Sequence, residues 1–349
     1  TGYHSLPMNR NEINWEKLFH ATDEQRRQVS ELLQKVSPLP ETGSFFDPDY
    51  TEERYVPVED GRIRLFHHHP DGKAGGIDVP EASIDDTAAR KSARPVVFLP
   101  GWGTVPEGFI DFFETVNRRI ETYYVETREK NSSQLDRKRA RLDLDSTAAD
   151  VQTVLDELGL SGRDDFVLMS TCWGSTILAH GLAKGLIKAP TVVLFDPMHS
   201  LWFPKWILRF ILPYTPLLFW RMIRPIGKRI ALLGMKEETQ KRRAEMFVDR
   251  AILWKWKRAA IAVRDIELYE SVSEIEQEVF VFNGVKDKIH SPTHYPRLAA
   301  LMPRARFFHL PTDESQREHL LGAAAVEFGK VTAEEGPPPP FRQFEKKIR

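Results

Sequence analysis

A single cysteine stands where a buried strand is expected to turn sharply into a helix, within the segment FVLMSTCWGSTIL at residues 166–178. A small residue lies two positions before Cys172 (Ser170) and another two positions after it (Gly174). Larger side chains there would collide across such a turn, which holds its central side chain out at the carboxyl edge of the sheet. The N-terminus of the following helix favours a thiolate. The pattern predicts a nucleophilic cysteine; the alternative is a small buried side chain that only packs.

This segment resembles the nucleophile elbow, G-x-S-x-G, of the α/β-hydrolase superfamily. Two residues depart from that pattern, because Ser170 replaces the first glycine and Cys172 replaces the nucleophilic serine. Dienelactone hydrolases and polyhydroxyalkanoate synthases are similar in placing a cysteine at this point. The resemblance covers about residues 54–330 and implies a catalytic triad whose nucleophile, acid and histidine follow one another along the chain.

The resemblance implies that Asp287 is the acid of the triad and His319 its base. Asp287 lies in the loop just after an expected strand, and His319 lies near the start of the last long helix. Asp196, which ends an earlier expected strand, is the rival acid, because some superfamily members place the acid there.

Three other histidines compete with His319. His309 lies within an expected strand, where a structural role is favoured. His290 and His294 follow Asp287 so closely that the carboxylate would not easily orient them.

The loop Gly101-Trp102-Gly103 after the first core strand resembles the superfamily's H-G-x-G oxyanion loop, with Pro100 in place of the histidine. Glycines allow backbone amides to approach a developing oxyanion closely. By resemblance, the amides of Trp102 and Trp173 are the donors.

An alternation of strands and helices must position these side chains, and the sequence has that alternation from residue 95 onward. Short apolar runs bounded by turn residues are typical of buried parallel strands. The expected strands are residues 54–58, 62–68, 96–99, 122–125, 166–169, 191–195, 279–282 and 307–310. The expected helices are residues 109–119, 146–158, 173–185 and 314–330. The pattern predicts an α/β fold with a mostly parallel, doubly wound sheet, as the α/β-hydrolase resemblance also implies.

The sequence divides into five expected parts. They are an N-terminal helical extension (1–50), the first part of the α/β core (51–198), a helical cap insertion (199–275), the second part of the core (276–335) and an extended, solvated tail (336–349) that contains four consecutive prolines.

Net charge, cysteine content and the motifs present limit which partners and cofactors the sequence predicts. The chain has 349 residues and a formal net charge of -1, which gives no case for a nucleic-acid partner. A single cysteine excludes an internal disulfide and a cysteine-based zinc site, and it fits a reducing, cytoplasmic compartment. Without a G-x-x-x-x-G-K-[ST] motif, no nucleotide phosphate loop is expected, and we predict no cofactor. The run His67-His68-His69 is not predicted to bind a metal, because neighbouring strand residues point to opposite faces.

The insertion is strongly basic. Residues 199–262 contain fourteen Lys or Arg and four Asp or Glu, a charge of +10, and the rest of the chain carries -11. Its longest uncharged run has eleven residues, too few to span a bilayer. The insertion could cover the site and bind a hydrophobic acyl chain, or dock on an anionic membrane, or simply pack on the core. The predicted substrate pocket is lined by Gly101, Gly103, His199 and Trp202.

These residues predict an acyl-transfer enzyme with a Cys172–His319–Asp287 triad that hydrolyses an ester or thioester of a hydrophobic, lipid-like acyl group. Transfer of the acyl group to an acceptor other than water is the alternative within that class. A non-catalytic ligand-binding homologue on the same scaffold is the alternative outside it.

Overall fold

The computed structural model describes residues 18–39, 45–72, 93–201, 203–233, 238–285, 293–312 and 314–349. The predicted acid Asp287, the rival base His290 and the pocket residue Trp202 lie outside these ranges.

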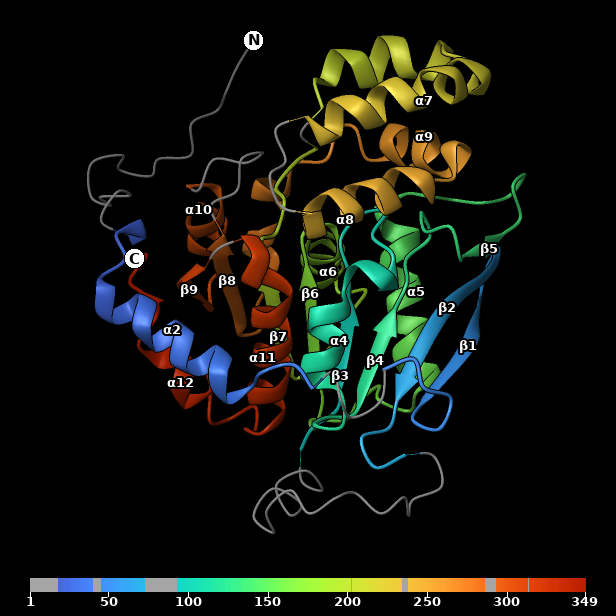
Figure 1. Cartoon of the computed structure of the whole chain (residues 1–349). Helices are drawn as coiled ribbons and strands as arrows, with labels where there is room; N and C mark the ends of the chain where they lie inside the picture. Colours follow the sequence, from blue (N-terminus) through green and yellow to red (C-terminus); the bar gives the residue numbers. More distant parts are fainter. Residues whose placement is uncertain are drawn as a thin grey trace.

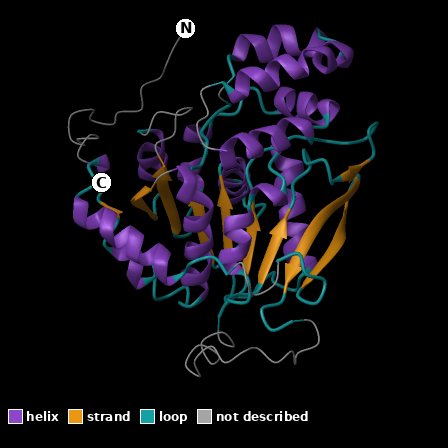
Figure 2. Ribbon diagram, in the orientation of Figure 1, coloured by secondary structure: helices purple, strands orange, loops and turns teal. Residues whose placement is uncertain are grey.

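A ten-stranded, mostly parallel sheet forms the centre of the molecule (Figures 1 and 2). The strands are β1 (Thr51–Val58), β2 (Gly61–His68), β3 (Val96–Leu99), β4 (Thr122–Val125), β5 (Gln134–Leu135), β6 (Val167–Thr171), β7 (Thr191–Phe195), β8 (Val279–Val285), β9 (Ala305–Thr312) and β10 (Glu345–Lys346). Their order is β1-β2-β4-β3-β6-β7-β8-β9-β10, and β5 pairs with β2. Strands β3, β4, β6, β7, β8 and β9 are parallel, whereas β1, β2, β5 and β10 pair antiparallel to their neighbours. The predicted fold class is confirmed.

Helices cover both faces of this sheet, as the alternation predicts. The helices around the sheet are α2 (Asp23–Lys35), α4 (Ile110–Val116), α5 (Leu144–Glu157), α6 (Trp173–Ala183), α10 (His294–Leu301), α11 (Arg317–Gly329) and α12 (Pro339–Arg342). Apolar side chains of α2, α4 and α11 share one buried cluster with alternate residues of the strands. Those of α5, α6 and α10 share the cluster on the opposite face. Strand residues such as Val97 and Phe98 therefore point into different clusters, and the strands are apolar on both sides.

The insertion adds three longer helices, α7 (Leu217–Leu232), α8 (Glu238–Asp249) and α9 (Leu253–Ala262). They lie beyond the carboxyl ends of the central strands, with α7 farthest from the sheet (Figure 1). No helix among the described residues is both long and apolar enough to cross a membrane.

The C-terminal segment 336–349 is folded, so the prediction of an extended, solvated tail is wrong. Its strand β10 pairs with β9, and Phe341 and Phe344 are fully buried. The Phe341 ring stacks on Phe328 of α11 at a centroid distance of 6.0 Å. The prolines start a short helix that turns these aromatic side chains onto the sheet. Proline content masked the apolar signal of the segment.

Candidate active site

The turn between β6 and α6 has the backbone of a strained elbow. Cys172 has φ 53° and ψ −114°, a left-handed conformation that is rare for residues other than glycine. Its backbone N–H donates to the Phe195 carbonyl at 2.8 Å, and its own carbonyl accepts from Thr176 at 3.2 Å. Such conformations cost ~1–3 kcal/mol and persist where the surroundings impose them, often at functional sites.

Close packing explains why small residues flank Cys172. A Cβ added at Gly174 would lie 2.5 Å from the Leu99 carbonyl oxygen and 2.8 Å from that of Pro100. Ser170 is fully buried, and its hydroxyl is 2.9 Å from that of Ser175. The two small positions identified in the sequence therefore let α6 begin directly against β3.

Cys172 is partly exposed, whereas Ser170 and Thr171 before it are buried. Its Sγ atom lies 3.6 Å from Sδ of Met198, and a Cβ at Gly101 would be 3.7 Å from the sulfur. The thiol thus lies between the oxyanion loop and the segment after β7. This exposure favours the nucleophile interpretation over a cysteine that only packs.

Arg317, at the start of α11, is the charged residue that the structure brings to this elbow. Its Nη2 atom lies 2.9 Å from Oδ2 of Asp196 and 3.2 Å from Oγ1 of Thr171. Burial lowers the pKa of Arg317, but the negative charge of Asp196, together with the ionisable Cys172 thiol, outweighs burial and raises it overall. The second Asp196 oxygen accepts a hydrogen bond from Nδ2 of Asn283 at 2.9 Å. The rival acid is therefore at the site, held by a guanidinium and an amide.

The structure does not bring His319 to Cys172. The His319 ring donates through Nε2 to the Val36 carbonyl at 2.7 Å, at the C-terminal end of α2. Burial lowers the pKa of His319. Successive helix residues are rotated by about 100°, so a helix that points Arg317 at the elbow turns His319, two residues later, to the other side. His319 does lie near the start of the last long helix, as expected, but its side chain is on the face of α11 that packs against the end of α2.

The other described histidines have contacts of their own. His309 is a strand residue, as predicted, and its ring packs edge-on against Phe19 while Nδ1 lies 3.2 Å from Oδ1 of Asn283. Burial lowers its pKa to about 4.

His199 and His294 stack on each other at 4.1 Å between ring centroids. His199 also stacks on Tyr269 at 4.8 Å, and the Tyr269 hydroxyl is 2.8 Å from Nδ1 of His294. His199 directly follows Met198, so this cluster of rings lies near the carboxyl end of β7.

A buried lysine holds the oxyanion loop by hydrogen bonds. Lys130 is 1% exposed and donates from Nζ to the Gly101 carbonyl and, at 2.8 Å, to Oγ1 of Thr104. Burial lowers its pKa. Glu129 accepts from the Gly103 N–H at 3.4 Å, and Gly103 takes the left-handed φ of 59° that favours glycine. The loop is thus held in one conformation by two charged side chains.

The insertion contacts this loop directly. The Trp102 ring packs edge-on against Trp173 at 5.0 Å and Trp256 of α9 at 6.1 Å. A Cβ at Gly103 would lie 2.3 Å from the Trp256 ring, so only glycine fits below the insertion. Lys255, also on α9, is buried and donates to the carbonyls of Lys130 and Ser133 at 2.7 and 2.6 Å. Burial lowers the Lys255 pKa to about 8.

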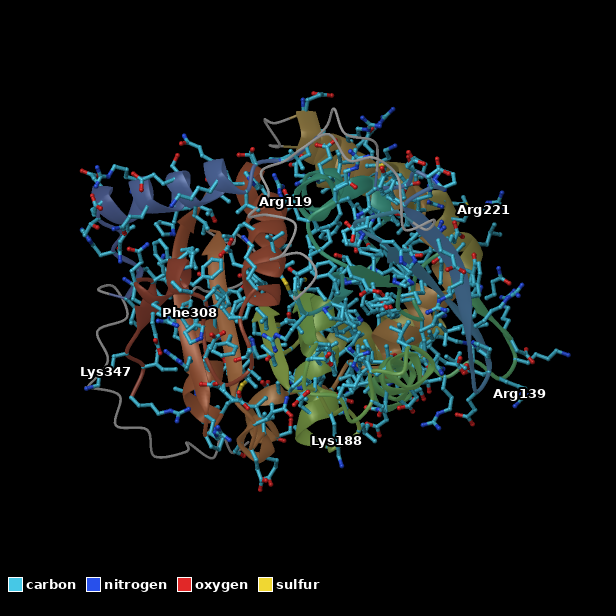
Figure 3. The ribbon with its side chains drawn as sticks, turned by 90° about the horizontal axis from the view of Figure 1, so that it is seen from below. Arg119, Arg139, Lys188, Arg221, Phe308 and Lys347 are labelled. Carbon is cyan, nitrogen blue, oxygen red and sulfur yellow. The ribbon has the colours of Figure 1, made fainter. Side chains whose placement is uncertain are left out.

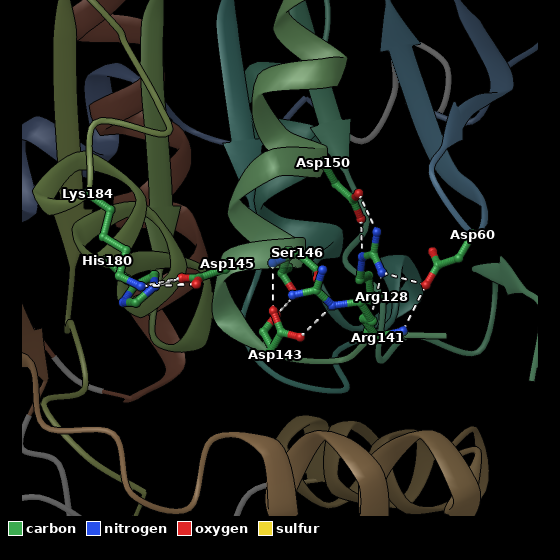
Figure 4. Close-up of polar contacts among 10 residues, drawn as sticks. Asp60, Arg128, Arg141, Asp143, Asp145, Ser146, Asp150, His180 and Lys184 are labelled. Atoms are coloured by element: carbon green, nitrogen blue, oxygen red, sulfur yellow. Dashed lines mark hydrogen bonds and ion pairs between the residues drawn. The ribbon is translucent and has the colours of Figure 1, made fainter. Parts of the chain in front are cut away.

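A buried ion network anchors the loop that carries Lys130 (Figure 4). Arg128 is 2% exposed, and its Nε and Nη2 atoms donate to the two oxygens of Asp150 at 2.5 and 2.7 Å. Nη1 of Arg128 bonds Asp60 at 2.9 Å. Burial raises the pKa of Asp150 to about 6 despite this arginine. The network ties the β4–α5 connection to α5 and to the β1–β2 hairpin.

Arg317, Lys130 and Met198 were missed by sequence reasoning. Each of these residues reaches the site because the fold brings together segments that are far apart in the sequence. Arg317 had one usable signal, since it lies two residues from the expected histidine and at the start of the same helix.

The histidine triplet is only partly separated by the strand geometry. His68 points into the core, but His67 and His69 are two residues apart and their rings meet at 3.8 Å. Potential ligand atoms of Glu52, His67 and His69 lie within 4.8 Å of one another. His67 is held by Glu121 at 2.7 Å, and this contact accounts for its orientation without a metal.

Comparison with known proteins places the chain in a family. Residues 96–321 match the model of the alpha/beta hydrolase family. The fold is similar to a hydrolase from Pseudomonas aeruginosa PA01 (TM-score 0.56, 15% identity, 78% of this chain and 96% of that one). It is also similar to an esterase from Exiguobacterium antarcticum (TM-score 0.56, 17% identity, 77% of this chain and 97% of that one). A third similar structure is the enol-lactonase from Burkholderia xenovorans LB400 (TM-score 0.53, 15% identity, 79% of this chain and 99% of that one). No curated protein matches the chain. Because the family model covers more than half of the sequence, and the sheet, the elbow and the loop before it agree with that match, the chain belongs to the α/β-hydrolase family.

Proposed function

We propose that the protein is a hydrolase in which Cys172 attacks the carbonyl carbon of an ester or thioester with a hydrophobic acyl group. The observation that carries this proposal is the strained backbone of Cys172, which keeps a partly exposed sulfur between the oxyanion loop and Met198, next to the Thr171 hydroxyl that Arg317 contacts. A packing cysteine has no need of a backbone conformation that costs free energy.

The positive charges near the sulfur favour attack by a thiolate. Arg317 and the N-terminus of α6 both stabilise negative charge at this point. In the first step the sulfur bonds to the carbonyl carbon, and the carbonyl oxygen becomes an oxyanion. The oxyanion then re-forms the C=O bond as the bond to the alcohol or thiol breaks, and the leaving group takes a proton from solvent. Water then adds to the carbonyl carbon of the acyl-cysteine and loses a proton to solvent. The tetrahedral intermediate breaks its C–S bond, which releases the carboxylic acid and restores the Cys172 thiolate.

Backbone amides are proposed to stabilise the oxyanion. The Trp173 amide is at the first position of α6, where backbone N–H groups have no partner within the helix. The Trp102 amide is the second proposed donor, on a loop that Lys130 and Glu129 hold in place. Asp196 keeps Arg317 beside the elbow in this scheme. We also propose that the insertion caps the site, because Trp256 and Phe247 lie against the glycine that follows Trp102.

Turnover of short p-nitrophenyl and acyl thioester substrates by the wild type and four variants tests the proposal. Cys172→Ala is expected to abolish turnover, and Arg317→Gln to reduce it more than Arg317→Lys, which retains the positive charge. His319→Gln is expected to retain turnover within a few fold, because this side chain serves the end of α2. Loss of turnover in His319→Gln equal to that in Cys172→Ala, at unchanged stability, would restore the Cys–His triad.

A non-catalytic binding protein is the second candidate, and the orientation of His319 favours it. Its prediction is a folded protein that binds acyl esters without consuming them. Turnover that depends on Cys172 excludes it.

A further inference from the structure

The outer surface of the insertion carries most of the exposed apolar side chains of the described chain. Of thirteen large hydrophobic residues that are exposed, eleven lie within residues 203–233. They are Phe203, Trp206, Phe210, Ile211, Tyr214, Leu218, Phe219, Met222, Ile226, Ile230 and Leu233. We call these eleven side chains the apolar surface. Contiguous exposed apolar patches on proteins mark interaction sites.

Helix α7 is amphipathic, but its apolar face is exposed, whereas an ordinary surface helix turns its apolar face toward the core. Leu218, Met222, Ile226 and Ile230 recur every four residues and form one stripe, between 59% and 70% exposed. The residues that contact the protein include cations instead. Arg224 donates to the Val248 carbonyl of α8, and Lys228 pairs with Asp249 at 2.7 Å and Glu245 at 3.8 Å. The polar anchors thus fix α7 with its apolar stripe toward the surroundings.

Exposed cations border this stripe. Arg221 and Arg229 are exposed on α7 next to the stripe, Lys205 is exposed earlier in the insertion, and residues 201–233 contain six Lys or Arg and no Asp or Glu. Arg221 extends from the outline of the molecule (Figure 3), and among α7, α8 and α9 it is α7 that lies farthest from the sheet (Figure 1). A second copy docked face to face would bring like charges together without an acidic partner. A membrane with anionic headgroups matches both the apolar stripe and the cations.

We propose that the apolar surface docks the protein on the face of an anionic lipid membrane, with α7 lying in the plane of the interface. Leu218, Met222, Ile226 and Ile230 enter the boundary between headgroups and acyl chains, while Arg221 and Arg229 contact lipid phosphates. This proposal is independent of the catalytic role of Cys172.

Co-sedimentation of the full chain with vesicles tests it. The vesicles are pure phosphatidylcholine, or phosphatidylcholine with 30% phosphatidylserine, each at about 100 mM and about 500 mM NaCl. Wild-type protein is expected to bind the anionic vesicles at least tenfold more than the neutral ones, and high salt should weaken that binding. Met222→Glu/Ile226→Glu should lose binding, and Arg221→Gln/Arg229→Gln should reduce it at least fivefold.

Lys188→Gln is the matched charge control, because Lys188 is exposed on another edge of the molecule (Figure 3) and should leave binding unchanged. Equal unfolding midpoints of the variants and wild type show that none of them acts through misfolding. Equal binding to neutral and anionic vesicles, or no binding, would overturn the proposal. A dimer that Met222→Glu/Ile226→Glu dissociates, without vesicle binding, would overturn it in favour of a second copy.

Discussion

Replacing Gly174 by alanine tests how closely α6 must approach β3 to form the elbow. The added methyl would lie 2.5 Å from the Leu99 carbonyl oxygen, whereas ordinary contact begins at 3.4 Å. One of the two backbones must therefore move by about 0.9 Å, since neither atom belongs to a flexible side chain. Overpacking of this kind costs ~1–3 kcal/mol. Misplacement of a reacting group by ~1 Å can lower a rate ~100-fold.

The assay combines urea unfolding with turnover of the p-nitrophenyl ester. We expect Gly174→Ala to lose more in rate than its modest loss of stability explains, because the sulfur moves with the start of α6. Gly227→Ala on α7 is the matched control. A Cβ there meets nothing within 4 Å, so this variant should be as active as wild type and slightly more stable. Wild-type rate and wild-type stability in Gly174→Ala would refute the elbow geometry.

Two further predictions concern buried charge. Asp150→Asn leaves the 2% exposed Arg128 paired with Asp60 but without its bidentate partner, and should cost ~1.5–3 kcal/mol of unfolding free energy in urea. A loss below ~0.5 kcal/mol would contradict the buried network. His68 is fully buried, and burial lowers its pKa to about 3 from the ordinary 6.5. The unfolded chain therefore binds the extra proton between these pH values, so stability should fall as pH drops from 6.5 toward 3, by up to ~1.4 kcal/mol per pH unit from this group. Urea midpoints of His68→Gln should depend less on pH over that range than those of the wild type, and an equal dependence would contradict the role of His68.

Local patterns predicted the parts of the fold that local physics decides. The apolar runs at 96–99, 166–169 and 191–195 predicted strands β3, β6 and β7, because burial on both faces of a parallel sheet leaves a continuous apolar signature. The elbow could be predicted since Ser170 and Gly174 must be small wherever such a turn forms.

The features that the sequence does not predict depend on which way a side chain points and on contacts between residues far apart in the chain. Whether Arg317 or His319 faces Cys172 is set by where α11 begins, and a shift of two residues reverses the answer. Lys130 contacts the oxyanion loop only because β4 lies beside β3. The tail was misjudged because Phe341 and Phe344 pack onto strands far away in the sequence.

Intact-mass spectrometry after brief incubation with activated acyl esters, quenched in acid, tests the central claim most directly. The account predicts one acyl adduct on the wild-type protein, located by peptide mapping to residues 166–178, and none on Cys172→Ala. An unmodified wild-type protein that nevertheless hydrolyses the ester, or an adduct that persists in Cys172→Ala, would contradict it.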